Sequence, residues 1–110
     1  MNQIALHNLD SWREALGEHS RVLLFKHSPI CPVSTAAHSE WQRFGQANEN
    51  LTTLFVDVIH DKPTARGLAE ACGVAHASPQ VILFVDSEPV WDASHGDITA
   101  GALQEVWDAK

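Results

Sequence analysis

One stretch constrains the fold of this chain more than any other. Residues 22–25 are a continuous apolar run that ends at the charged pair Lys26-His27. The length and branched residues of the run predict a strand buried on both faces, as in a sheet covered by helices. A proline-bounded segment follows, and a helix is predicted to begin at Cys31-Pro32. A strand, a helix and a further strand in this order predict a right-handed crossover between parallel strands.

The predicted helix start places a cysteine where a thiolate is stabilised. Proline suits the first helical position, because its fixed φ is helical and its missing N–H is not needed there. Cys31 therefore falls at the N-cap, where unpaired backbone N–H groups and the positive end of the helix dipole converge. This setting favours the thiolate, which is the nucleophilic form of cysteine. We predict that Cys31 is the reactive group, against the alternative that it only fills a helix start.

The residue three positions further on is Ser34, where a dithiol redox pair carries its second cysteine. Ser34 is either a plain helix-start residue or the donor of a hydrogen bond to the Cys31 thiolate. In neither case can it resolve a mixed disulfide, so Cys31 must wait for an external thiol. His27, just before the loop, either holds charge near Cys31 or only caps the strand. His38 lies about 10 Å from Cys31 by helix rise, so no contact between them is expected.

The second cysteine, Cys72, belongs to the apolar stripe of a predicted helix that also includes Ala65, Leu68 and Ala69. This position favours a buried structural cysteine that forms no disulfide with Cys31. The alternative is that Cys72 is a distant resolving cysteine. No spacing of histidines and cysteines matches a zinc site, so we predict no metal.

The remaining patterns complete an α/β fold, a central mixed sheet of four to five strands with helices on both faces. The closely spaced last two strands predict a hairpin, and a proline opening the last strand predicts an edge. Gly17, Gly45 and Gly73 are interpreted as helix stops, and Ser11 as the start of a capping box. The predicted strands are 3–7, 22–26, 51–59, 80–86 and 89–93, and the predicted helices are 11–16, 32–44, 64–72 and one capped by Thr99.

Length and composition predict a single domain over residues 1–110, with 45% hydrophobic and 19% charged residues. The net charge of −7 argues against a nucleic-acid surface and against binding to an anionic membrane. No stretch has transmembrane length, and the first residues lack the pattern of a signal peptide. We therefore expect a cytoplasmic protein in a reducing compartment, where an exposed cysteine is more often catalytic than structural.

Two features together resemble the thioredoxin fold: a cysteine that opens the helix after a buried strand, and Ser78-Pro79 before a hairpin. The resemblance implies that the Ser78–Pro79 bond is cis and faces Cys31 across the active-site surface. It covers nearly the whole chain. Three segments are similar to one family within this fold, the monothiol bacilliredoxin family (YtxJ-like). They are residues 25–28, 31–38 and 78–80.

The resemblance implies a thiol-disulfide oxidoreductase that acts with bacillithiol, the small thiol that replaces glutathione in some bacteria. Cys31 would attack the mixed disulfide between bacillithiol and a protein cysteine, so that the protein thiol leaves reduced. A second bacillithiol or a reductase would then regenerate Cys31. No tightly bound cofactor is expected, and bacillithiol is the co-substrate. The supporting residues would be His27, Pro32, Ser34, Ser78 and Pro79.

Two other classes of function fit the same residues. The first is a thioredoxin-like binding protein in which Cys31 holds a thiol adduct or an iron–sulfur cluster between two subunits, which would give a brown dimer. Pro32, rather than a glycine, favours the enzyme because it stiffens the loop. The second is a peptide-binding adaptor, which predicts an unreactive Cys31.

Overall fold

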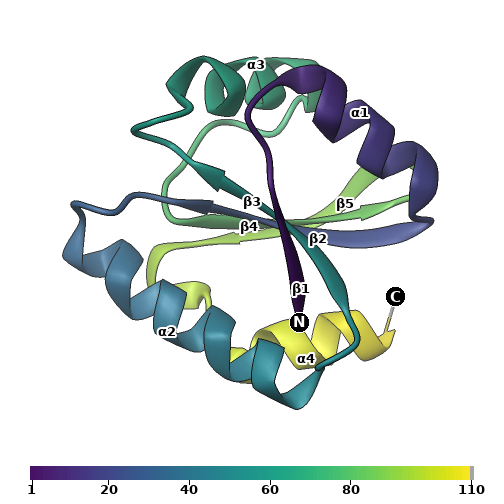
Figure 1. The fold of residues 1–110 in the computed structure, drawn as a ribbon. Helices are drawn as coiled ribbons and strands as arrows, with labels where there is room; N and C mark the ends of the chain where they lie inside the picture. The colour runs from purple at the N-terminus through teal and green to yellow at the C-terminus, as the bar shows by residue number, and fades with distance from the viewer. Residues whose placement is uncertain (110) are drawn as a thin grey trace.

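A computed structural model describes residues 1–109 of the chain. Within this range five strands form one mixed sheet, and helices pack on both of its faces (Figure 1). This architecture and the order of the elements confirm the predicted fold class, including the first of the five predicted strands. The strands are β1 (Asn2–Ala5), β2 (Arg21–His27), β3 (Thr52–Asp57), β4 (Gln80–Val85) and β5 (Glu88–Ser94). The helices are α1 (Leu9–Glu18), α2 (Pro32–Ala47), α3 (Lys62–Cys72), the 3₁₀ turn η1 (His95–Asp97) and α4 (Ala100–Ala109).

The strand order is β1-β3-β2-β4-β5, which places β2 at the centre and β5 at an edge. β1 and β2 both run parallel to β3, whereas β4 runs antiparallel to β2 and β5 antiparallel to β4. Asp86 and Ser87 join β4 to β5 with φ values of 50° and 68°. Two positive φ values are typical of the tight turn whose twist matches that of a hairpin. The predicted hairpin and edge strand are therefore confirmed.

β2 is buried on both faces, as its apolar run predicts. Val22 and Leu24 face one hydrophobic cluster, beneath α1 and α3. Leu23 and Phe25 face the other cluster, beneath α2 and α4 (Figure 1). All four side chains are fully buried, which stabilises the fold by roughly 1.5–3 kcal/mol each. The same alternation carries a charged side chain, that of Lys26, into the α1 and α3 layer.

The start and the end of α1 differ from the sequence prediction. Asn8, and not Ser11, is the N-cap, because its Oδ1 accepts hydrogen bonds from the Ser11 N–H and Oγ–H, each at 2.8 Å. Asparagine is among the strongest N-cap residues, so the helix begins after Asn8, about one turn earlier than predicted. Gly17 is not a stop: α1 passes through it and ends at Glu18.

The prediction that Gly45 ends α2 is also wrong, because α2 continues to Ala47 and Asn48 is its C-cap. A Cβ added to Gly45 would lie 2.7–3.0 Å from side-chain atoms of Met1, so this glycine serves close packing rather than termination. Gly73 does end α3, with φ of 75° and its N–H bonded to the Ala69 carbonyl.

Smaller differences concern other elements, and β1 ends at Ala5 rather than at residue 7. α3 begins two residues before the predicted position, at Lys62, and β3 is shorter at both ends than predicted. Between β5 and α4, where the sequence predicts neither a strand nor a helix, the structure has the turn η1. Thr99 caps α4 as predicted, since its Oγ1 accepts from the Ala102 N–H at 3.1 Å. Within residues 1–109, no helix has the combination of length and hydropathy that crossing a membrane requires.

Candidate active site

The predicted site segments meet at one end of the sheet. β2 ends at His27, and the loop 28–30 leads into α2. Lys26 pairs with Gln80 at the start of β4, so the preceding Ser78–Pro79 lies beside the end of β2. Figure 1 shows the chain entering α2 and the chain entering β4 at this same end. The fold thus brings together residues that are far apart in the sequence.

Cys31 is the N-cap of α2, with extended backbone angles of φ −106° and ψ 121°, and Pro32 opens the helix. Its backbone N–H donates to the Ser28 carbonyl at 3.3 Å, which closes the loop into a turn. The residue is half-buried and its thiol is free. Its neighbours Ile30 and Val33 are 78% and 46% exposed. A partly accessible thiol at a helix N-terminus is the setting in which cysteines act as nucleophiles.

Ser34 points inward rather than toward Cys31. It is fully buried, its Oγ accepts from the Ser28 N–H at 2.9 Å, and it is hydrogen-bonded to His27 Nδ1 at 2.8 Å. No hydrogen bond joins Ser34 to Cys31 in the described part of the chain, so of the two alternatives for Ser34 the structure does not show the one in which it donates to the thiolate. Instead the hydroxyl ties together the end of β2, the start of the loop and the first turn of α2.

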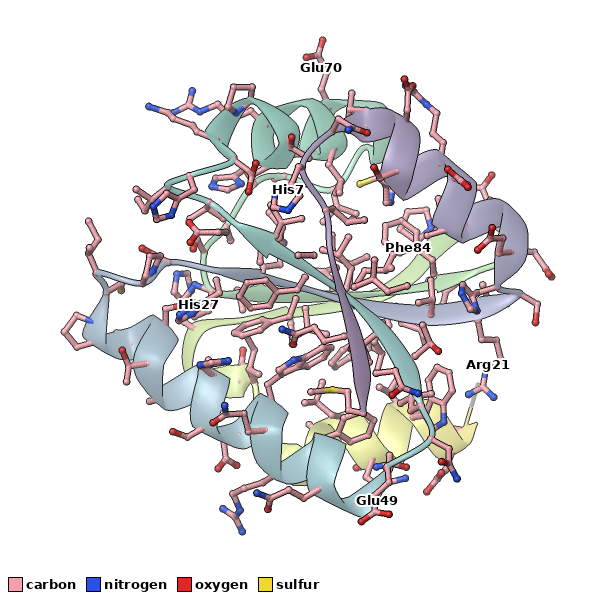
Figure 2. All side chains as sticks on the ribbon, in the orientation of Figure 1. His7, Arg21, His27, Glu49, Glu70 and Phe84 are labelled. Carbon is pink, nitrogen blue, oxygen red and sulfur yellow. The ribbon has the colours of Figure 1, made fainter. Side chains whose placement is uncertain are left out.

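His27 belongs to a pair of imidazoles beneath the first turns of α2. Its ring stacks on that of His38, with 4.6 Å between the ring centroids. Phe25 and Phe55 border both rings at centroid distances between 5.6 and 6.1 Å. Figure 2 shows His27 at the end of the sheet where α2 begins. The sequence analysis missed this pair, although the one-turn spacing of Ser34 and His38 on α2 is a signal for it.

The surroundings of both imidazoles favour their neutral form. Burial lowers the pKa of His27, the neighbouring His38 lowers it further, and the carboxylate of Asp57 partly opposes both effects. Burial also lowers the pKa of His38. In its neutral form, His27 can accept a hydrogen bond at Nδ1 from the Ser34 hydroxyl, while the Ser28 N–H donates a hydrogen bond to the same oxygen. The pair therefore supports the loop without placing a positive charge there.

Ser78 and Pro79 lie beside the end of β2, at the same end of the sheet as the start of α2. The bond between them is cis, in agreement with the prediction. Pro79 is buried, and the Ser78 Oγ is buried with no hydrogen-bond partner among the described residues.

Cys72 lies in the last turn of α3, which covers the face of the sheet opposite to α2 (Figure 1). It packs against the hydrophobic cluster of that face and is free. It is half-buried rather than mostly buried as predicted, because it sits at the end of its helix, next to exposed Gly73. Among residues 1–109, no three His, Cys, Asp or Glu side chains are grouped so that they could hold a metal ion.

The sheet order, the cysteine that opens α2 and the cis-proline before β4 define a thioredoxin-fold protein with a thiol redox function. A solved structure provisionally described as an oxidoreductase with a thioredoxin fold is 28% identical, with a TM-score of 0.88 over 96% of this chain and 93% of that chain. Mitochondrial thioredoxin 3 from Saccharomyces cerevisiae is 17% identical, with a TM-score of 0.76 over 96% of this chain and 93% of that one. The thioredoxin of Fasciola hepatica is 14% identical, with a TM-score of 0.76 over 99% of this chain and 98% of that one.

The family is more specific than the fold. The family model of the monothiol bacilliredoxin BrxC matches residues 4–103. The chain therefore belongs to the monothiol bacilliredoxin family, as its sequence motifs indicate.

Proposed function

We propose that this protein removes bacillithiol from mixed disulfides on other proteins, with Cys31 as the nucleophile. The observation that carries the proposal is that residue 34 is a serine and not a second cysteine. Its buried hydroxyl is hydrogen-bonded to His27 and Ser28, and Cys31 is the one thiol at the start of α2. A single accessible thiol suits exchange with a small thiol better than reduction of a protein's internal disulfide. The family name supports bacillithiol as the co-substrate.

The proposed reaction has two exchange steps. The Cys31 thiolate attacks the bacillithiol sulfur of the mixed disulfide, and the bond between that sulfur and the target cysteine breaks. The target leaves as a thiolate, takes up a proton and is thereby reduced, while Cys31 carries the bacillithiol. A second bacillithiol thiolate, or a reductase, then attacks the adduct and releases Cys31. With bacillithiol as the reductant, the product is bacillithiol disulfide.

The other site residues have supporting roles in this scheme. Pro32 fixes the first turn of α2, while Ser34 and His27 hold the loop that carries Cys31. The backbone beside the Ser78–Pro79 bond borders the place where a target would approach. The partners are bacillithiol-modified proteins, a low-molecular-weight thiol and a recycling reductase.

The test compares release of bacillithiol from a modified target with reduction of insulin. We expect wild type to release bacillithiol and to reduce insulin weakly, and Cys31→Ser to do neither. Ser34→Cys should gain insulin reduction, because a second sulfur at this position can close a disulfide with Cys31 and expel the bound partner. Release by Cys31→Ser, or equal insulin reduction by wild type and Ser34→Cys, would contradict the proposal.

The same preparations address the two remaining alternatives. Loss of turnover at unchanged stability in Cys72→Ala would assign a resolving role to Cys72, whereas unchanged turnover is expected. Protein purified without oxygen should be colourless and should not dimerise. A brown dimer that loses its colour in Cys31→Ser would instead support the cluster-binding function.

A further inference from the structure

The loop before Cys31 is held by a chain of hydrogen bonds that starts at His27, where β2 ends beside the start of α2 (Figure 2). His27 Nδ1 lies 2.8 Å from the Ser34 Oγ, and the Ser28 N–H donates to the same oxygen at 2.9 Å. The Ser28 carbonyl in turn accepts from the Cys31 N–H at 3.3 Å. Ser28 and Ser34 are buried, with 7% and 0% of their surface exposed. The backbone of Cys31 is thus connected to one ring nitrogen of His27 through two buried residues.

These contacts determine which nitrogen of His27 carries the ring hydrogen. The Ser34 hydroxyl has one hydrogen to donate, and its two partners among the described residues are the Ser28 N–H and His27 Nδ1. The Ser28 N–H is itself a donor, so the hydroxyl hydrogen goes to His27 Nδ1. Nδ1 is therefore unprotonated, and the ring hydrogen is on Nε2. The next proton that the ring takes up has to bind at Nδ1, the atom that holds the loop.

Proton uptake at this nitrogen converts an acceptor into a donor. The Ser34 oxygen would then face two donors, and its own hydrogen would be buried without an acceptor. A buried polar group without a partner and a partly buried charge both cost free energy. Both costs disappear when the loop moves away from the ring and water enters. The protonated ring therefore favours a loop that has left its place.

The groups around His27 set the pH at which this happens. His38 on α2 stacks on His27 with 4.6 Å between the ring centroids. Asp57 on β3 is the register partner of His27, and its carboxylate also binds the exposed His60. Burial and His38 lower the pKa of His27, and Asp57 partly opposes them, so proton uptake occurs below pH 6.5. The side chain of Lys26, the preceding residue on β2, points to the opposite face of the sheet.

We propose that His27 is a positioning residue for Cys31 and that it acts only while Nδ1 is unprotonated. In that state the hydrogen-bond chain keeps Cys31 at the N-cap of α2, where the helix stabilises its thiolate. Uptake of a proton at Nδ1 releases the loop, so Cys31 loses part of this stabilisation and reacts more slowly. Acid therefore slows the chemistry of Cys31 in two ways, through the thiol itself and through His27. The inference concerns the reactivity of Cys31 toward any reagent and goes beyond the proposed activity on bacillithiol.

The test measures alkylation of Cys31 by iodoacetamide, a neutral reagent, between pH 5 and pH 8. The Cys31 thiolate forms a bond to carbon and iodide leaves, and mass spectrometry follows the product. All proteins carry Cys72→Ser, so that one thiol reacts. His27→Asn replaces Nδ1 by an amide oxygen the same number of bonds from the backbone, which keeps an acceptor for Ser34 but takes up no proton. Dividing the wild-type rate by the His27→Asn rate at each pH removes the titration of the thiol.

We expect this ratio to be about one at pH 8 and to fall at least about threefold by pH 5. His38→Phe keeps an aromatic ring on His27 and removes the second imidazole, so the fall should begin at a higher pH. His27→Phe, which has a ring but no acceptor, should react slowly at both ends of the range. The matched control is His19→Asn, which removes a histidine near the other end of β2 and should behave as the wild type does.

Hydrogen exchange of the wild type gives a second measurement that needs no variant of His27. The Ser28 amide donates to Ser34, whereas the Asp86 amide donates to the Ser20 carbonyl at the other end of the sheet. After correction for the intrinsic pH dependence of exchange, the Ser28 amide should lose more protection than the Asp86 amide between pH 7.5 and pH 5.

Two results would overturn the inference. One is a ratio of alkylation rates that stays constant or rises toward pH 5, and a rise would mean that an imidazolium charge stabilises the thiolate instead. The other is an equal loss of protection at the Ser28 and Asp86 amides. Neither measurement uses bacillithiol, so failure of the proposed function would leave both of them unchanged.

Discussion

At the residue scale, Ser34 has two separate consequences for this site. As a hydroxyl in place of a second thiol, it makes the site monothiol. As a buried group bonded to His27 and Ser28, it also holds the loop before Cys31 in place. The second role is structural, and it would persist whether or not the protein acts on bacillithiol.

This structural role can be measured with Ser34→Ala. The substitution leaves the buried Ser28 N–H without its acceptor, which should lower the free energy of unfolding by about 1–3 kcal/mol. Urea denaturation gives the value, and the exposed Ser39→Ala on the same helix is the control, with a change within about 0.5 kcal/mol. Equal stabilities of the two variants would show that the Ser34 hydrogen bonds contribute nothing.

At the element scale, two glycines at similar positions in their helices have different structural roles. Gly17 and Gly45 both lie near the C-terminal end of a helix, and both are inside it rather than after it. No atom lies within 4 Å of a Cβ added at Gly17, whereas one added at Gly45 would collide with Met1. Position in the sequence does not distinguish the two cases, but packing against the N-terminal residue does.

A matched pair of substitutions tests this distinction. Gly17→Ala should raise the free energy of unfolding by about 0.5–1 kcal/mol, because alanine is the better helix former and the site is open. Gly45→Ala should lower it by about 1–3 kcal/mol, because the new methyl group displaces the Met1 side chain. Thermal or urea unfolding measures both. A stabilising effect of Gly45→Ala would show that Met1 moves aside without cost.

At the scale of the whole molecule, the stacked histidines make stability depend on pH. The pKa values of His27 and His38 are lowered in the folded protein, so the unfolded chain binds more protons below pH 6.5. The free energy of unfolding should therefore fall as pH decreases from 7 to 5, and it should change little above pH 7 on account of these groups.

The measurement is urea denaturation of wild type and variants across this pH range. His38→Gln should flatten the fall, since it removes one of the two depressed groups and relieves the other. His60→Gln is the control with the opposite sign, because the hydrogen bond to Asp57 raises the pKa of His60. Removing it should leave the fall at least as steep. A slope in His38→Gln equal to that of wild type would contradict the assignment.

The sequence by itself determined the parts of this protein that depend on local physics. The apolar run before Lys26 specified a strand with two buried faces, and Cys31-Pro32 specified a helix start with the cysteine at its N-cap. Ser34 in place of a cysteine indicated a monothiol site, which agrees with the family to which the chain belongs. Each of these follows from side-chain polarity, a fixed φ angle or spacing along one element.

Only the tertiary structure decided the contacts between elements. The His27–His38 stack requires α2 to lie on β2, and the direction of the Ser34 hydroxyl depends on that packing. The environment of Lys26 requires β4 and the loop before it to lie beside β2. Spacing along a chain predicts which residues share a face of one element, but not which element covers that face. That choice depends on how both sides of the sheet are filled, which is a property of the whole fold.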